Sequence, residues 1–254
     1  MTTQTLSDGP LPSIERIRHE IRLRSLTVSA VERLTPHMLR ITLSGGDLSD
    51  FISASADDHV KIFIPGAGEP ERRDYTPRRY DNGEQSLVLD FAVHDAGPAT
   101  QWALEAKPGS KLTVGGPRGS MVISNVKRWL LVGDETALPA MGRRIEEAGA
   151  DQSIISVAAV SGPEDEQSFT TQASLTSHWV HRPLSRATDA SGLISVLETI
   201  DLQPGTFAWV AAEATVARAV RSYLVEKRGH PLTWLKANGY WALGEADAHV
   251  SIEA

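Results

Sequence analysis

The stretch ERRDYTPRRYD, residues 71–81, holds four arginines and two tyrosines around one proline, Pro77. Guanidinium groups this close together repel one another unless an anion or an aromatic ring lies among them. Arginine side chains donate hydrogen bonds in pairs, a geometry that suits phosphate and carboxylate groups. These residues therefore suggest anion binding, and the partner could be solvent, an acidic neighbour, a nucleic acid or a phosphate-bearing cofactor.

The position of these residues on a strand decides which of them share a face. If the stretch ends a strand, Arg73 and Tyr75 point to one side, whereas Asp74 and Thr76 point to the other. Pro77 holds Thr76 in the extended region and ends the hydrogen-bond ladder. A ring, a hydroxyl and two guanidinium groups would then meet one flat anionic ligand. A solvated strand whose arginines pair with neighbouring carboxylates explains the spacing equally well.

Composition limits the choice of partner. The chain has 254 residues, of which 41% are hydrophobic and 22% charged, and its formal net charge is −7. This is a globular composition, and a general nucleic-acid binder is usually basic, so only a local basic pocket for a compact anion fits. The chain has no cysteine, which excludes disulfides, thiolate zinc sites, thiol nucleophiles and cysteine-ligated iron–sulfur clusters. Redox chemistry would need a bound organic cofactor or a metal without thiolate ligands.

The N-terminus gives no sign of targeting to a membrane. Residues 1–25 are polar and charged, without the apolar centre of a signal peptide. No run approaches the roughly 20 apolar residues that span a bilayer. We therefore expect a soluble, cytoplasmic protein with no membrane insertion.

The first half of the chain alternates apolar and polar residues, as strands do. Val60, Ile62 and Ile64 fall on one side of a short run, and residues 87–93 repeat the pattern. Clusters of glycine, proline and asparagine separate such runs. Several short strands joined by turns predict a small antiparallel β-barrel, with one helix over residues 97–106.

The second half has a different periodicity. RWLLVG, residues 128–133, is a short apolar run typical of a buried parallel strand. Leu138, Met141 and Ile145 then fall on one helical face. Further apolar runs, predicted as strands, alternate with helical patterns, and the last of these runs is PLTWLKA, residues 231–237. The change falls near residues 120–127. The sequence thus predicts a two-domain β + α/β fold: an antiparallel β-barrel followed by a parallel-sheet nucleotide-binding α/β domain.

The opening motif resembles that of a known family. Arg73-x-Tyr75-Thr76-x-Arg78 is similar to the flavin-binding motif of the siderophore-interacting protein family, which belongs to the ferredoxin-reductase-like flavoproteins. The resemblance implies that Tyr75 packs on the isoalloxazine ring, Thr76 approaches its N5 edge and Arg73 meets the FAD diphosphate. Tyr75 and Thr76 are thus expected at the reacting ring, with Asp74 and Arg78 as further cofactor contacts.

A second segment, DFAVHDAGPATQWA, resembles the part of the family that wraps the flavin diphosphate. His94, Thr100 and Trp102 fall on its matching positions and are expected to bind the cofactor. Without the resemblance, His94 is more simply a loop histidine with satisfied hydrogen bonds, and Trp102 a core residue of an amphipathic helix.

A third segment, GDETALPAM, resembles the family signature of the nicotinamide-binding half. Gly133 permits a tight turn out of a strand, and a helix N-terminus after it would suit a dinucleotide phosphate. Asp134 and Glu135 would cap that helix, but their charges would repel a pyrophosphate. The resemblance places all five residues at the cofactor, with Thr136 and the backbone amides, rather than the carboxylates, facing the phosphates: Gly133, Asp134, Glu135, Thr136 and Ala137. A plain helix cap is the alternative.

Two later segments resemble the family as well. AAEATVARAVRSYL implies that Glu213 lines the nicotinamide side, and WLKANGYWALG places Trp241 at the cofactors. Lys236, Arg118 and Arg79 are candidates for holding an anionic iron chelate. A core aromatic pair on the last strand explains the second segment equally well.

Other patterns argue against metal-dependent or hydrolytic chemistry. His178 and His181 are three residues apart, so a strand would send them to opposite faces, and no metal site is predicted. Neither H-E-x-x-H nor G-x-S-x-G is present, which disfavours a zinc protease or an esterase.

The resemblance implies an NAD(P)H-dependent, FAD-containing ferric-siderophore reductase that converts Fe(III) to Fe(II) and so releases iron. It places an FAD-binding β-barrel domain at 20–122, an NAD(P)H-binding α/β domain at 123–254 and an N-terminal extension at 1–19. The expected partner is a ferric siderophore, without nucleic acid or an obligate protein partner. A flavin-dependent reductase of a quinone or other acceptor, and a non-catalytic siderophore-binding module, are the alternatives.

Both nicotinamide donors stay open. Glu164, Asp165 and Glu166 follow the second parallel strand, where an acidic residue holding a ribose 2′-hydroxyl would favour NADH. Arg182 could instead receive the 2′-phosphate of NADPH. The general tendency of the family favours NADPH slightly.

Overall fold

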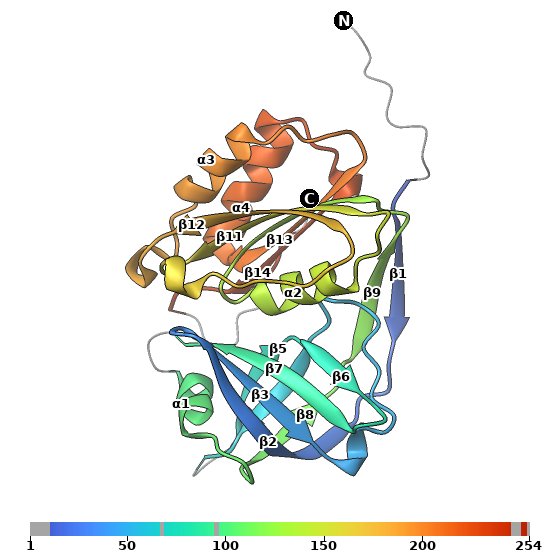
Figure 1. The fold of residues 1–254 in the computed structure, drawn as a ribbon, viewed down its shortest axis with the longest axis vertical. Coiled ribbons are helices and arrows are strands. Elements are labelled where there is room, and N and C mark those ends of the chain that lie inside the picture. Colours follow the sequence, from blue (N-terminus) through green and yellow to red (C-terminus); the bar gives the residue numbers. More distant parts are fainter. Residues whose placement is uncertain (1–10, 67–68, 94–96, 245–249, 253–254) are drawn as a thin grey trace, which may run out of the picture.

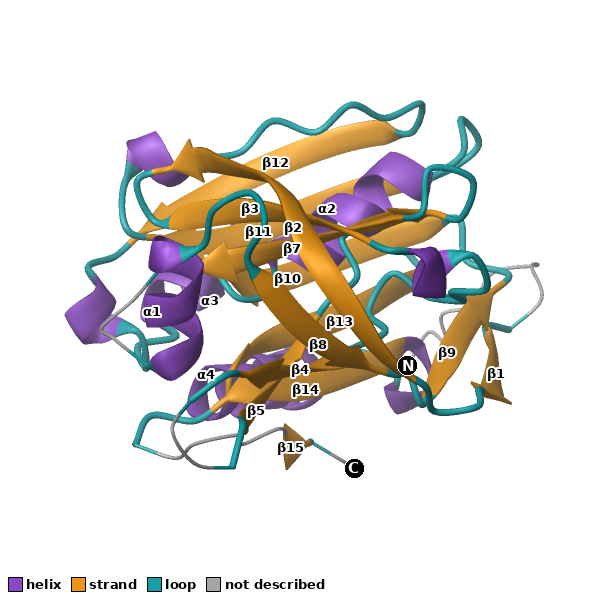
Figure 2. Cartoon of the chain, turned by 90° about the horizontal axis from the view of Figure 1, so that it is seen from below, coloured by secondary structure: helices purple, strands orange, loops and turns teal. Residues whose placement is uncertain are grey.

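The computed structural model describes residues 11–66, 69–93, 97–244 and 250–252 of the chain. Figure 1 shows an antiparallel sheet below and a parallel sheet with its helices above. A two-stranded ribbon, β1 with β9, runs along one side of both. In Figure 2 the molecule is seen from below, and the ribbon again stands to one side of the two sheets. No helix in the described part of the chain has the length and apolar character needed to cross a membrane.

The lower sheet, called the half-barrel here, has seven strands in the order β5-β4-β8-β2-β3-β7-β6. Every pairing in it is antiparallel. Its strands are β2 (Leu23–Thr35), β3 (Met38–Ser44), β4 (Val60–Ile64), β5 (Glu71–Tyr75), β6 (Arg79–Asp81), β7 (Ser86–Ala92) and β8 (Lys111–Gly115). No ladder joins β5 to β6 within the ranges that the structure describes. The predicted antiparallel sheet is confirmed, and it curls without closing.

The core of the half-barrel lies where the apolar alternation predicts it. The alternating apolar residues of β4 and β7 are at most 5% exposed: Val60, Ile62, Ile64, Leu87, Leu89 and Phe91. Helix α1 (Pro98–Glu105) adds Ala99 and Ala103 to the same cluster. Pro98 opens the helix because a first-turn residue needs no backbone donor. The helix expected over 97–106 is therefore present.

The upper sheet and its helices are called the parallel-sheet half. Its strands run in the order β12-β11-β10-β13-β14-β15, with only the last pairing antiparallel. They are β10 (Arg128–Asp134), β11 (Ser153–Val160), β12 (Ser174–His181), β13 (Thr206–Glu213), β14 (Leu235–Trp241) and β15 (Val250–Ser251). The chain leaves the β12 edge and returns on the other side of β10. Ligands of such sheets bind at the carboxyl ends of the strands, at the point where the order reverses.

Helices cover both faces of this sheet, because β10 is apolar on both sides. Trp129 and Leu131 pack in the cluster of α2 (Leu138–Glu147), whereas Leu130 and Val132 pack in that of α3 (Ser191–Thr199) and α4 (Ala214–Ser222). A π-helical turn, Tyr223–Lys227, extends α4. One predicted strand start is wrong: the segment PLTWLKA begins with a 3-10 turn, Leu232–Trp234, and β14 starts only at Leu235.

The ribbon of β1 (Ser13–Arg18) and β9 (Gly119–Ser124) is not predicted by the sequence, which assigns residues 1–19 to an extension. Five of the six β1 residues are exposed, so the strand carries no alternating apolar signal. Gly119 permits the close pairing, because a Cβ there would lie 2.5 Å from the carbonyl oxygen of Ile17.

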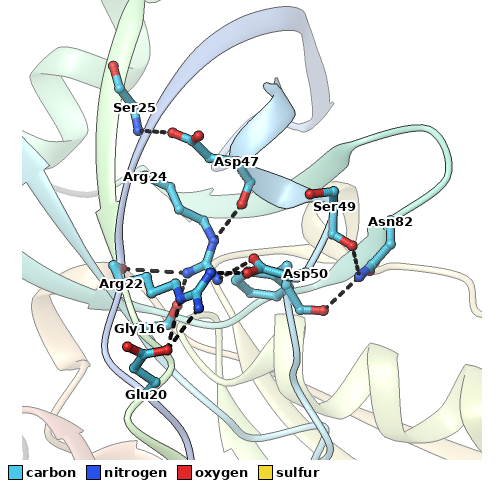
Figure 3. A network of polar contacts seen from close by, with 10 residues as sticks. Glu20, Arg22, Arg24, Ser25, Asp47, Ser49, Asp50, Asn82 and Gly116 are labelled. Atoms are coloured by element: carbon cyan, nitrogen blue, oxygen red, sulfur yellow. Dashed lines mark hydrogen bonds and ion pairs between the residues drawn. The ribbon is translucent and has the colours of Figure 1, made fainter.

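A buried arginine fixes the end of the half-barrel that lies away from the parallel sheet. Arg24 is 5% exposed and donates to the carbonyl oxygens of Asp47 and Gly116, both at 2.9 Å, and to Asp50 at 3.2 Å (Figure 3). Asn82 extends the network by donating to the carbonyl oxygen of Ser49 at 3.0 Å. Arg24 is thus a structural residue that ties the short 3-10 helix η1 (Gly46–Leu48) to the turn after β8.

Candidate functional site

An aromatic row lies at one side of the half-barrel. The ring of Tyr75, at the end of β5, has its centroid 4.3 Å from that of Phe91, which lies 5.8 Å from that of Trp102 on α1. Tyr75 and Trp102 are half-buried and pack against the core. Desolvation raises the pKa of the Tyr75 hydroxyl despite the charge of Arg73, so the phenol stays neutral. The structure thus brings together two predicted flavin contacts, and Phe91, whose pattern predicts only a core position, completes the row.

Arg73 and Asp74 lie on opposite faces of β5, as the strand geometry predicts. Arg73 donates to Glu71 at 2.8 Å and to the carbonyl oxygen of Arg72 at 2.7 Å. Asp74 forms an ion pair with Lys61 of β4 at 3.2 Å. Both residues are half-buried. These contacts within the half-barrel do not test whether Arg73 and Asp74 bind a cofactor, so that part of the prediction stays a prediction.

The segment that follows β5 joins the half-barrel to the parallel-sheet half. Thr76 is 8% exposed, and its side chain lies close enough to the hydroxyl of Tyr240 on β14 to lower the pKa of that group, which burial raises overall. The carbonyl oxygen of Pro77 accepts a hydrogen bond of 3.0 Å from Arg143 of α2. Figure 1 shows α2 on the side of the upper half that faces the half-barrel. The predicted N5-contacting residue Thr76 therefore lies where the two halves meet.

Arg78 makes a bidentate ion pair across this junction. It is 5% exposed, and its two terminal nitrogens each donate a hydrogen bond to the carboxylate of Glu146 on α2, at 2.7 and 2.6 Å. Burial alone would raise the pKa of Glu146, but Arg78 outweighs it and holds that pKa below its usual range. Arg78 thus has an acidic partner 68 residues away, and its predicted contact with the flavin stays a prediction.

The remaining predicted contacts of the half-barrel lie on or before α1. Thr100 is 4% exposed within the first turn of the helix. His94 lies outside the described residues.

The turn between β10 and α2 is packed too closely for any side chain at Gly133. A Cβ there would lie 2.6 Å from the Cβ of Ala137, 2.8 Å from the carbonyl oxygen of Ala211 and 2.9 Å from the sulfur of Met141. Ala137 itself is fully buried and is the N-cap of α2. The predicted tight turn is present. The predicted caps are wrong in detail, because neither Asp134 nor Glu135 occupies the N-cap position.

Asp134 is the centre of the hydrogen bonds at this edge. Its Oδ1 accepts from the backbone N–H and the hydroxyl of Thr136, at 2.9 and 2.6 Å. Its Oδ2 accepts from the backbone N–H of Glu213 at 2.8 Å and from Nε1 of Trp241 at 3.0 Å. Four predicted cofactor residues from three strand ends are therefore connected directly. Thr136 uses its donors on Asp134, so its expected contact with phosphates stays a prediction.

Glu135 forms a buried ion pair with Arg182, which follows β12. Arg182 donates to the two carboxylate oxygens at 3.3 and 2.8 Å, and the side chains are 8% and 10% exposed. Burial raises the pKa of Glu135, the charge of Asp134 adds to this, and Arg182 opposes it. The arginine proposed from the sequence for a 2′-phosphate thus lies at the carboxyl edge, held by a carboxylate.

Glu213 is both the last residue of β13 and the N-cap of α4. Its Oε2 accepts from the backbone N–H groups of Thr215 and Val216, at 2.6 and 3.2 Å, and its Oε1 accepts from Leu243 at 3.4 Å. The side chain is 2% exposed. Its capping role explains the sharp strand-to-helix turn.

The three candidate substrate residues do not converge. Lys236 on β14 is 14% exposed, and its ammonium pairs with Asp57 of the half-barrel, which also accepts from Nε1 of Trp209 at 2.9 Å. Arg79 and Arg118 are exposed. No contact found among the described residues connects these three cations.

Asp57 is a residue of the junction that sequence reasoning missed. Burial would raise its pKa, but the charge and hydrogen bond of Lys236, together with Trp209 and Ser55, lower it to about 2. The acidic pair Asp57–Asp58 reads in the sequence as an ordinary polar turn, because its partner Lys236 is 179 residues away. Within the described ranges, no group of three or more histidine or acidic side chains could hold a metal ion.

Two family profiles match the two halves. The profile described as "Siderophore-interacting FAD-binding domain" matches residues 27–72 and 65–121, and that described as "Siderophore-interacting protein" matches residues 126–244. A crystal structure of a siderophore utilization protein from T. fusca is 32% identical, covers 93% of this chain and 98% of that chain, and has a TM-score of 0.85. More distant matches show the fold of ferredoxin-reductase-like flavoproteins.

Two curated relatives carry functional names. The NADPH-dependent ferric-chelate reductase of Escherichia coli K12 is 41% identical over 152 residues, which are 52% of this chain and 59% of that protein. The ferric vibriobactin reductase of Vibrio cholerae is 26% identical over 236 residues, which are 84% of this chain and 86% of that protein.

Proposed function

The chain belongs to the siderophore-interacting protein family, and from that premise we propose that it is an FAD-containing, NAD(P)H-dependent ferric-siderophore reductase. Relatives named as an NADPH-dependent ferric-chelate reductase and a ferric vibriobactin reductase support this activity and this class of substrate.

One observation carries the proposal: the segment 76–78, which follows Tyr75 of the aromatic row, contacts β14 and α2 of the parallel-sheet half. Thr76 reaches Tyr240, the carbonyl oxygen of Pro77 accepts from Arg143, and Arg78 pairs with Glu146. A flat ring held by the row would lie next to a dinucleotide bound where the strand order reverses. Electron transfer needs this adjacency, because a chain without cysteine has no iron–sulfur cluster to bridge a longer gap.

The residues at this place fit FAD. Tyr75 and Trp102 are aromatic side chains that are only half-buried, as a stacking platform requires. Gly133 leaves no room for a side chain at the first strand-to-helix turn of the parallel sheet, because α2 and β13 pack closely against it, as the strand and helix of a dinucleotide-binding turn do. When bound, FAD would accept a hydride and pass its electrons singly to Fe(III).

The protein's own residues would orient and shield the reactants. Tyr75, neutral and packed on Phe91, would support one face of the ring. Thr76, next to Tyr240, would present its hydroxyl at the ring edge. The closely packed junction around Arg78 and Arg143 would keep water from that side.

We propose NADPH as the donor. The relative from Escherichia coli is named for it. Two of the three acidic residues that favour NADH already have partners: Asp165 accepts from the backbone of His37 at 3.0 Å, and Glu166 pairs with His181 at 2.9 Å. A steady-state comparison of NADPH with NADH tests this choice.

Absorbance spectroscopy tests the whole proposal. Protein reconstituted with FAD should be yellow and should lose its visible absorbance when NADPH is added without oxygen. A ferric siderophore should then restore the absorbance, while a ferrous-specific chelator records the Fe(II) released.

Other outcomes would identify the alternatives. Recovery with a quinone but not with any ferric chelate would indicate a different acceptor. Binding of a siderophore without bleaching by either nicotinamide would indicate a non-catalytic module, and failure to retain FAD would overturn the proposal. The domain bounds, the cytoplasmic location and the lack of an obligate protein partner stay predictions.

A further inference from the structure

The side chain of Asp134 is 1% exposed, yet it has no cationic partner among the ion pairs of the described residues. A buried carboxylate is costly unless hydrogen bonds satisfy its oxygens. Each oxygen of Asp134 accepts two donors, so its four lone-pair positions are filled. The carboxylate is therefore not available for contact with a ligand.

The donors come from three neighbouring strand ends. Thr136 belongs to the turn after β10, Glu213 ends β13 and Trp241 ends β14. These strands are adjacent in the sheet, and their carboxyl ends form the edge that binds ligands in such folds. The ladder between β13 and β14 shifts register between Ala212 and Glu213 and then pairs Glu213 with Trp241, the two residues whose donors meet on Asp134.

We infer that Asp134 is a positioning residue, which fixes the indole of Trp241 and the end of β13 as one wall of the dinucleotide site. This inference rests on the proposed function. It replaces the expectation that Asp134 contacts the cofactor directly, because a saturated carboxylate with 1% exposure can act only through its neighbours.

Hydrogen-bond chemistry predicts which substitutions matter. An asparagine has one acceptor oxygen, and its NH₂ group must replace one carboxylate oxygen. An NH₂ group on the Thr136 side deprives only the backbone N–H of Thr136 of its acceptor, because the hydroxyl of Thr136 can turn to accept from the NH₂. On the other side it would deprive both Nε1 of Trp241 and the backbone N–H of Glu213, which can only donate. D134N should therefore place its NH₂ toward Thr136 and keep Trp241 in position. D134A should release Trp241.

The test measures NADP⁺ binding to the FAD-loaded protein by calorimetry, without turnover. D134A and W241F should each weaken NADP⁺ binding about 10-fold, and the double variant should be no weaker than either alone. D134N should stay within about threefold of the wild type. The ratio of bound FAD to protein should be unchanged in all of them.

A matched control uses the other indole that donates to a buried aspartate. Trp209 bonds Asp57 at 2.9 Å and is 4% exposed, away from the carboxyl edge, so W209F should leave NADP⁺ affinity unchanged. Additive effects of D134A and W241F would overturn the inference, as would a D134N variant as weak as D134A. If D134A does not fold, the W241F and D134N variants still test the inference. Unchanged NADP⁺ binding in W241F would overturn it, and so would loss of NADP⁺ binding in D134N. Failure of the wild type to bind NADP⁺ would instead contradict the proposed function.

Discussion

At the scale of single residues, buried charges determine which substitutions the carboxyl edge of the parallel sheet can tolerate. Arg182 and Glu135 satisfy each other there with two hydrogen bonds. Removing one partner of a buried ion pair destabilises the fold by more than the intact pair stabilises it, because the remaining charge then has neither water nor an opposite charge beside it. The pKa of Glu135 is already raised by burial and by Asp134, so its carboxylate depends strongly on Arg182.

We predict that R182M lowers the free energy of unfolding by about 3 kcal/mol at pH 7. A carboxyl whose folded pKa is raised favours the folded state at low pH, and that advantage disappears as pH rises through the unfolded and then the folded pKa. R182M removes the opposing charge and raises the pKa of Glu135 further, so its deficit against the wild type should grow from pH 4 to pH 7. Urea unfolding across this range measures it.

The double variant R182M/E135Q is the control for this prediction. It removes both charges, so it should recover most of the lost stability and lose the pH dependence of the deficit. Equal deficits for R182M at pH 4 and pH 7 would show that Arg182 stabilises the fold by packing alone.

The residue types of the site could be predicted from the sequence, but their partners could not. The opening motif places Arg73 and Tyr75 on one face, because strand alternation is local. The partner of Arg78 lies 68 residues away, and that of Trp241 lies 107 residues away. Such pairs depend on how helices and strands pack, which no local pattern specifies.

At the scale of elements, the turn from β10 into α2 depends on the absence of one side chain. We predict that G133A costs about 3 kcal/mol of stability, since a methyl group would meet backbone and buried side chains rather than flexible ends. NADP⁺ binding should weaken with it, because the turn must shift. Thermal unfolding and calorimetry measure the two effects.

Gly46 provides a matched glycine in a short 3-10 helix. A Cβ there meets nothing within 4 Å, so G46A should leave stability within about 0.5 kcal/mol of the wild type. A G133A variant as stable as G46A would contradict the packing argument.

Elements with a strong periodic pattern could be predicted, and those without one could not. The apolar runs of β4, β7 and β10 and the apolar face of α2 lie where the sequence predicts them. Strand β1 could not be predicted because it is exposed and has no row of buried apolar residues. The 3-10 start of PLTWLKA escapes because a short apolar run fits a turn or a strand equally well.

At the scale of the whole molecule, charged contacts hold the two halves together. Asp57 binds Lys236 and Trp209, Arg143 donates to the hydroxyl of Ser53 at 2.7 Å, and Arg78 binds Glu146. The relative position of the halves is therefore fixed by pairs buried at the junction.

We predict that K236M lowers the free energy of unfolding by roughly 2 kcal/mol at pH 7, the energy equivalent to the depressed pKa of Asp57. That pKa is lowered from 3.8 to about 2, so the contribution is complete above pH 4 and is lost as pH falls toward 2. The difference between the variant and the wild type should therefore shrink between pH 4 and pH 2. Denaturant unfolding of both proteins at several pH values measures it.

Arg128 supplies a control at the start of β10 in the same sheet, where it is exposed and donates to the carbonyl oxygen of Pro204 at 3.3 Å. R128M should change stability by less than about 0.5 kcal/mol at any of these pH values. A deficit of K236M that does not depend on pH would show that Asp57 is not the group it stabilises.

The ribbon of β1 and β9 has a consequence for the order of events during synthesis. Residues 13–18 leave the ribosome early, but their partners at 119–124 emerge only after the last half-barrel strand, which ends at Gly115. The first residues of β2, 23–27, likewise wait for β8, whereas the rest of the strand pairs with β3. The first strand therefore stays unpaired while the whole half-barrel is translated, and it closes as the chain begins to supply β10. Pairing of β1 thus reports that the first half is complete before the second starts to fold.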